Sequence, residues 1–65
     1  MQPHQQRVVE EKAALDIKLE ALNDFIDENP IFQKLDIGEQ GRLYAQTYAM
    51  RQYSDILGER IDRFQ

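Results

Sequence analysis

The sequence predicts an all-α fold: an antiparallel two-helix hairpin with a short helical connector, assembling into a homo-oligomer. Only three Gly and two Pro interrupt the 65 residues, and no long stretch alternates apolar and polar residues as a strand would. Apolar residues recur every seven positions in two long segments, which is typical of one-sided helices. The chain is short enough for one domain, which we expect to span residues 1–65.

The first helix is expected over residues 3–28. This segment is rich in Glu, Ala, Lys and Leu, and Pro3 suits the first turn of a helix. The residue before a proline avoids the helical conformation, so the helix should end at Asn29, before Pro30. Its apolar stripe consists of Val8, Leu15, Leu19, Leu22 and Ile26.

A connector is expected at residues 29–36. Asn29 can cap a short helical turn that begins at Pro30. The apolar side chains of this segment are expected to cover the end of the hairpin; they are Ile31, Phe32, Leu35 and Ile37.

The second long helix is expected over residues 37–64, with Asp36 as its N-cap and Glu39 completing a capping box. Gly58 in its interior indicates either a close approach of the backbone or a tolerated defect. A short connector makes the two helices antiparallel neighbours. The expected facing pairs are Leu22 with Leu43, Leu15 with Met50, and Val8 with Leu57, with Ile61 and Phe64 extending the second stripe.

Composition excludes several classes of protein. The chain has no Cys, so it holds neither a disulfide framework nor a thiolate metal site. Eight Lys and Arg against twelve Asp and Glu give a net charge of −4, which argues against DNA or RNA as a partner. No apolar run is long enough to span a membrane, and the first residues lack a signal-peptide core. We therefore expect an intracellular protein with no membrane partner.

Catalysis has few candidate residues. Thr47 and Ser54 occupy gaps in the second apolar stripe, where they make room or bond back to the helix. His4 lies close to the terminus without an orienting carboxylate. We expect no catalytic residue, no metal site, no cofactor and no enzymatic activity.

Small and apolar residues also follow the outer sides of both helices. The candidates for an oligomer interface are Ala13, Ile17 and Ala21 on the first helix, and Ala45, Ala49 and Ile56 on the second. Residues 1–39 carry 4 basic and 9 acidic side chains, whereas residues 40–65 carry 4 and 3. This asymmetry favours contacts between unlike helices of different copies. The alternative is that the Ala residues serve only helix propensity.

Aromatic and basic side chains converge on the second helix. Tyr44 and Tyr48 lie one turn apart, and Arg51 follows on the same side. Such a set can stack on a base and pair with a phosphate. Arg7 and Lys12 are further candidates for ligand binding, but an antiparallel hairpin places them at the other end, so a second copy would have to supply them. The alternative is that the Tyr residues merely pack at an interface.

A negative stripe follows the first helix, with carboxylates every four residues: Asp16, Glu20, Asp24 and Glu28. A solvated face accounts for such a stripe, and so does a surface that binds a basic protein partner.

The framework of the chain resembles a family of small phage-encoded helical-hairpin proteins, related to the hairpin domain of anti-CBASS and Thoeris anti-defence sponge proteins. The resemblance covers residues 7–64 and rests on Arg7-Val8-Val9-Glu10-Glu11-Lys12, Leu15-Asp16-Ile17-Lys18, Leu22, Phe25-Ile26, Phe32, Leu35, Glu39-Gln40, Met50, Tyr53-Ser54 and Leu57-Gly58-Glu59-Arg60-Ile61.

The resemblance implies an all-helical oligomer, a hexamer in the best known members, that acts in the host cell cytoplasm. It implies sequestration of cyclic di- or trinucleotide immune signals in pockets between protomers, without catalysis. No binding residue of the family is carried over to this chain, so the Tyr, Arg and Lys candidates rest on their chemistry alone. The alternative function is an acidic protein-binding inhibitor or adaptor that acts on a host partner.

Overall fold

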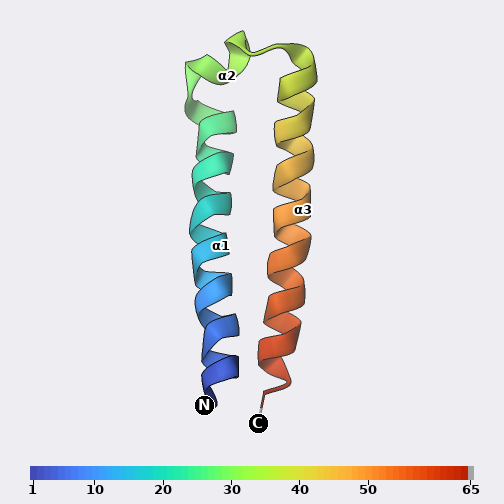
Figure 1. Cartoon of the computed structure of the whole chain (residues 1–65). Coiled ribbons are helices and arrows are strands. Elements are labelled where there is room, and N and C mark those ends of the chain that lie inside the picture. The colour runs from blue at the N-terminus through green and yellow to red at the C-terminus, as the bar shows by residue number, and fades with distance from the viewer. Residues whose placement is uncertain (65) are drawn as a thin grey trace.

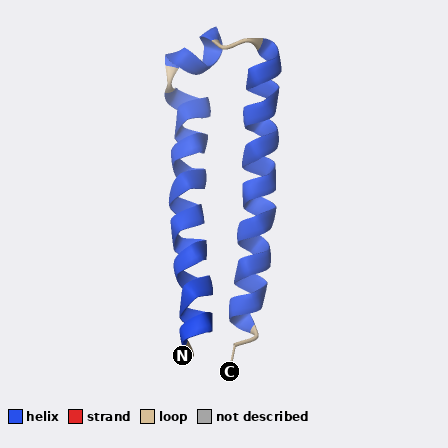
Figure 2. Ribbon diagram, in the orientation of Figure 1, coloured by secondary structure: helices blue, strands red, loops and turns tan. Residues whose placement is uncertain are grey.

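The computed structural model describes residues 1–64, and all its regular structure is helical (Figure 2). The helices are α1 (Pro3–Glu28), α2 (Pro30–Lys34) and α3 (Ile37–Asp62), which confirms the predicted all-α class. α1 and α3 lie side by side and run in opposite directions, α2 joins them at one end, and both termini lie at the other (Figure 1). The molecule measures 47 × 15 × 14 Å. Within the described residues, no helix is long and apolar enough to cross a bilayer.

The break between α1 and α2 follows from Pro30. Asn29 is extended, with φ −89° and ψ 122°, as the residue before a proline must be. Its Oδ1 atom accepts a hydrogen bond from the Ile31 amide at 2.9 Å. Asn29 thus ends one helix and caps the next.

The start of α3 differs in one respect from the expected capping box. Asp36 caps the helix, since its Oδ2 atom accepts from the Gly38 amide at 2.9 Å. Glu39 does not complete the box, because its carboxylate pairs with the Nε atom of Arg42 at 2.8 Å. A guanidinium one turn away is a stronger partner for a carboxylate than a backbone amide.

The end of α3 is tighter than the regular helix. α3 ends at Asp62, two residues before the expected end at residue 64. The Arg63 amide donates to the carbonyl of Arg60, and the Phe64 amide donates to that of Ile61. Bonds between residues three apart close the last turn and stop the helix.

The core is thin because each long helix is covered on one side only. The buried hydrophobic side chains are Val8, Ile26, Phe32 and Leu57. The other members of the two apolar stripes are half-buried. The outer sides of α1 and α3 therefore have no protein packed on them within one copy.

The connector is fastened to α3 by Gln40 and Phe32. The Nε2 atom of Gln40 donates to the carbonyls of Phe32 at 3.0 Å and Leu35 at 3.1 Å. Phe32 is 2% exposed, and its ring meets Phe25 and Tyr44 edge to face, with centroids 6.2 and 5.5 Å away. The contact with Phe32 also holds the ring of Tyr44, which is one of the candidate ligand-binding residues.

Candidate functional site

The candidate site on α3 is an exposed flank that we call the tyrosine face, formed by Tyr44, Tyr48 and Arg51. Spacings of four and three residues place the three side chains on one side of the helix. Tyr44 is 55% exposed and Tyr48 is 66% exposed. Two aromatic rings and a cation thus stand beside one another on a flank that is largely exposed in one copy.

The two rings of the tyrosine face are held differently. Tyr44 packs against the buried ring of Phe32 at an interplanar angle of 83°. The Thr47 hydroxyl donates to the backbone carbonyl of Tyr44 at 2.7 Å, so Thr47 bonds back to its own helix. Tyr48 makes no aromatic contact within residues 1–64. Tyr44 is therefore preorganised, and Tyr48 presents the more open ring.

The structure does not bring Arg7 and Lys12 to the tyrosine face of the same copy. Both residues lie in the first half of α1, toward the termini, whereas Tyr44 and Tyr48 lie in the first half of α3, toward α2. Arg7 is exposed. Lys12 is half-buried and occupied by a contact between the two long helices.

That contact is a polar network of Lys12, Asp16 and Ser54. The Nζ atom of Lys12 donates to the Ser54 Oγ at 2.7 Å and to the Asp16 Oδ2 at 3.0 Å. The Ser54 hydroxyl donates to the other Asp16 oxygen at 2.5 Å. Gly58 leaves the space that the Lys12 stem uses, because a Cβ atom at Gly58 would lie 3.4 Å from the Lys12 Cε.

The network also changes the acidity of Asp16. The hydrogen bond from Ser54 has the largest effect, followed by that from Lys12, and together they hold the pKa of Asp16 below its ordinary value of 3.8. Desolvation acts in the opposite direction. The Asp16 side chain is still 47% exposed, so solvent screens its ion pair with Lys12.

Sequence reasoning missed this network, although a signal was present. Pairing Val8 with Leu57 and Leu15 with Met50 places Lys12 within one position of Ser54 on the facing helix. A serine in an apolar stripe, facing a lysine that has an aspartate one turn later, is a pattern for a polar contact across the seam. Gly58, one turn after Ser54, adds to this pattern, because a glycine leaves space for a long side chain from the facing helix.

The network does not have the geometry of a nucleophilic site. Ser54 is 5% exposed, and its hydroxyl is engaged by Asp16 and Lys12. Attack on a substrate requires an accessible oxygen near donors that stabilise the developing charge. Among residues 1–64, no group of three or more His, Cys, Asp or Glu could hold a metal ion.

All six candidates for the oligomer interface are exposed in one copy. They are Ala13, Ile17, Ala21, Ala45, Ala49 and Ile56. Ile17 is 69% exposed and Ile56 is 55% exposed. Large aliphatic side chains are thus exposed on both long helices and leave a face of each helix without a partner in one copy.

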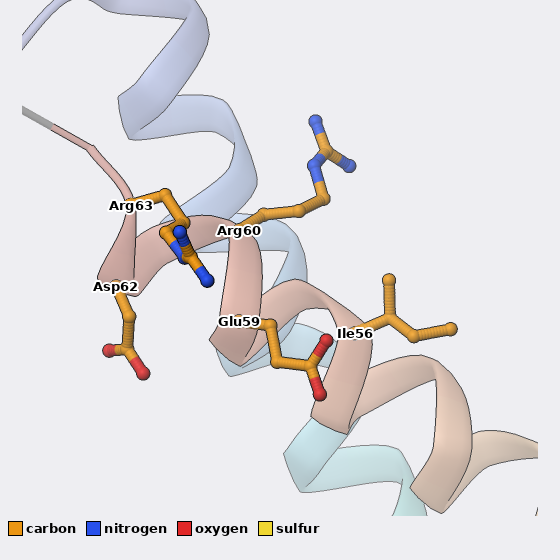
Figure 3. Close-up of a pocket in the computed structure, with 5 residues that line it drawn as sticks. All are labelled: Ile56, Glu59, Arg60, Asp62 and Arg63. Carbon is orange, nitrogen blue, oxygen red and sulfur yellow. The ribbon is translucent and has the colours of Figure 1, made fainter.

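Two shallow hollows lie at opposite ends of the molecule. The α3-end hollow is formed by the last two turns of α3 (Figure 3) and is lined by Ile56, Glu59, Arg60, Asp62 and Arg63. The α1-end hollow lies where α1 meets α2 and is lined by Ala21, Asp24, Phe25, Glu28, Asn29 and Pro30. Each combines apolar atoms with charged groups.

Comparison with known families gives one match. The profile of a family described as Sequestin matches residues 2–63, nearly the whole chain. This match confirms the resemblance seen in the sequence. Neither a curated protein nor a solved structure matches the chain.

Proposed function

The chain belongs to the Sequestin family, and on that premise we propose that it is a phage anti-defence protein that sequesters cyclic nucleotide immune signals. The family's name denotes sequestration, which is a binding function and needs no chemical conversion. In this proposal the ligand is a cyclic di- or trinucleotide, bound in pockets between protomers in the host cell cytoplasm. Removing the signal by binding keeps it from its effector.

The observation that carries the proposal is the exposed tyrosine face. An aromatic ring stacked on a base contributes about 1–3 kcal/mol, and Tyr48 offers a ring that is 66% exposed. A guanidinium pairs with phosphate oxygens through two parallel hydrogen bonds, and Arg51 is exposed beside the rings. A cyclic nucleotide presents both bases and phosphates to such a surface.

One copy supplies only part of a pocket. The tyrosine face is a convex helix flank, and a small ligand needs to be enclosed from more than one side. In the proposal, a second protomer supplies the other wall and further cations. Arg7 is exposed and forms no ion pair within residues 1–64, whereas Lys12 would have to exchange its bonds to Asp16 and Ser54 for the ligand.

Self-assembly is therefore part of the proposed function. Buried hydrophobic side chains are few in one copy, and chains of this size often gain missing burial by association. The proposed interface uses the outer rows centred on Ile17 and Ile56. The resemblance to sponge proteins supports a hexamer.

A thermal-shift scan against cyclic dinucleotides, cyclic trinucleotides and cyclic ADP-ribose isomers tests the ligand class. A ligand at 100 times its Kd adds about 2.7 kcal/mol to the folded state, which shifts the Tm of so small a domain by many degrees. We expect one class to produce such a shift. A flat response to the whole panel from a folded oligomer would overturn the proposal for these ligands.

Two variants test the tyrosine face itself. Tyr48→Ala and Arg51→Ala should each raise the Kd at least about tenfold, since each removes one stacking or phosphate contact. Tyr53→Ala is the matched control, because Tyr53 is 43% exposed but points about 140° away around the helix from Tyr48. Unchanged affinity in both test variants would exclude the tyrosine face as the site.

The alternative function uses the acidic stripe of α1. Glu20, Asp24 and Glu28 are exposed and form no ion pair within residues 1–64, whereas Asp16 is bound to Lys12. A basic host protein could dock along these three carboxylates. This alternative predicts salt-sensitive association that is lost on reversal of Glu20 and Asp24, and a host-protein pull-down insensitive to both changes would refute it.

A further inference from the structure

The two hollows carry charges of complementary kinds. The only charged side chains of the α1-end hollow are the carboxylates of Asp24 and Glu28. The α3-end hollow contains the guanidinium groups of Arg60 and Arg63. It also contains two carboxylates, of which that of Asp62 points away from Ile56 and Arg60 (Figure 3).

Among residues 1–64, these charges form no ion pair with an opposite charge. The ion pairs among residues 1–64 join Lys12 to Asp16 and Glu39 to Arg42. Neither pair involves a residue of either hollow. Six charged groups beside exposed apolar atoms are thus left without an ion-pair partner among residues 1–64.

A single copy cannot bring the two hollows together. One lies where α1 meets α2, and the other lies at the end of α3 beside the chain termini (Figure 1). They are separated along the long dimension of a molecule that extends 47 Å. Any contact between them has to join two copies.

The spacing of the two sets also matches. On α3, Ile56 precedes Arg63 by two helical turns, and on α1, Ala21 precedes Glu28 by the same two turns. If α3 of one copy lies parallel to α1 of another, Ile56 meets Ala21 at the same register at which Arg63 meets Glu28. Apolar and ionic contacts then form together.

We propose that the α3-end hollow of one copy binds the α1-end hollow of a second copy. Arg60 and Arg63 pair with Asp24 and Glu28 of the second copy, and Ile56 covers Ala21 and Phe25. This contact rests on the proposed self-assembly and specifies its partner surfaces. It joins two different surfaces, so each copy keeps one free hollow and assembly continues beyond a dimer.

Charge reversal with complementation tests the contact. Arg60→Glu with Arg63→Glu makes both hollows acidic. Asp24→Arg with Glu28→Arg makes the α1-end hollow basic, so that Arg60 and Arg63 of the next copy meet like charges. Each double variant alone should self-associate with a dissociation constant at least about tenfold above that of the unmodified chain, as measured by sedimentation velocity. An equimolar mixture should recover association, because the reversed α3-end hollow of one variant meets the reversed α1-end hollow of the other, and the unmodified hollows of the two variants pair as in the original chain.

Controls separate this contact from general charge effects and from misfolding. Lys18→Glu with Lys34→Glu changes the net charge by the same amount outside both hollows and should assemble normally. Arg60→Gln with Arg63→Gln removes the cations without reversal, should keep the same helical circular dichroism, and should weaken association less than the Glu pair does.

The outcomes distinguish the contact from the broader proposal. Normal assembly of both reversed variants, or a mixture of folded variants that stays dissociated, overturns the contact while leaving homo-oligomerisation intact. An unmodified chain that sediments as a monomer at low salt overturns both. The contact is supported if the two reversed variants associate when mixed but not separately, and if the Lys18→Glu, Lys34→Glu control assembles like the unmodified chain.

Discussion

Lys12 on α1 donates a hydrogen bond from its Nζ atom to the Oγ atom of Ser54 on α3, at 2.7 Å, inside a seam that is otherwise mostly apolar. Asp16 accepts from both side chains, so each of the three is bonded to the other two. In the described residues, no buried side-chain nitrogen or oxygen lacks a hydrogen-bond partner. A contact of this kind is directional, and it therefore fixes how the two helices are set against each other more strictly than apolar packing does.

Ser54→Ala should destabilise the fold. The change removes a hydroxyl that is 5% exposed and leaves the Lys12 and Asp16 groups that face it without one partner each. We expect a loss of about 1–2 kcal/mol, seen as a Tm lower by several degrees at equal protein concentration. Thr47→Ala is the control, since the Thr47 hydroxyl bonds only to its own helix and its loss should be nearly neutral. A Ser54→Ala chain as stable as the unmodified chain would show that the network is not stabilising.

The difference in stability between the unmodified chain and the Asp16→Asn variant should depend on pH. The pKa of Asp16 is lowered in the folded state, chiefly by Ser54 and then by Lys12, so the carboxylate favours folding above its ordinary pKa of 3.8. That contribution is lost as the pH falls through the folded-state pKa. Urea unfolding measured between pH 7 and pH 2 should therefore give the unmodified chain the larger free energy of unfolding near neutral pH. The difference from the variant should vanish in acid.

Asp24→Asn is the control for that measurement, because it removes one carboxylate from the same helix at a position without an ion pair in the described residues. A stability difference for Asp16→Asn that stays constant over the whole pH range would contradict the assigned role of the charge.

The helical class could be predicted because it depends on local properties. Pro30 fixes the break after Asn29, and Asp36 needs only its own side chain to reach the Gly38 amide. The Lys12–Ser54 contact depends on how far each helix is rotated toward the other, which local propensity does not determine. The prediction that Glu39 completes a capping box was wrong for a related reason. The capping-box pattern involves only Asp36 and Glu39, whereas in the structure Arg42 binds the Glu39 carboxylate.

The candidate site could be predicted in part. Helical spacing is enough to group Tyr44, Tyr48 and Arg51. It could not indicate that Phe32 anchors the Tyr44 ring, because that contact depends on the path of α2 across the end of the long helices. It likewise offered Lys12 as a ligand contact without the competing partners that the fold provides.

Phe32→Leu should loosen the tyrosine face. Phe32 is 2% exposed and touches the ring of Tyr44, so a smaller and non-aromatic side chain leaves space beside that ring. We expect a loss of roughly 1–3 kcal/mol and faster flipping of the Tyr44 ring in NMR spectra. Ile31→Ala on the same short helix is the control, because Ile31 is 55% exposed. An unchanged Tyr44 ring in Phe32→Leu would mean that Phe32 does not position it.

Gly58→Leu should disrupt the network, whereas Gly41→Leu should not. A Cβ at Gly58 would lie 3.4 Å from the Lys12 Cε, so a methyl group is tolerated but a longer side chain displaces Lys12 from Ser54. No atom lies within 4 Å of a Cβ at Gly41, where replacement gains about 0.5–1 kcal/mol of helix propensity. Gly58→Leu gains the same propensity but loses the network, so its free energy of unfolding should fall below that of Gly41→Leu by about 1–2 kcal/mol. In the Ser54→Ala background, where the Lys12–Ser54 contact is already lost, the difference in unfolding free energy between the two Leu variants should be smaller. Equal unfolding free energies for the two Leu variants in the unmodified background would show that Lys12 does not need the space at Gly58.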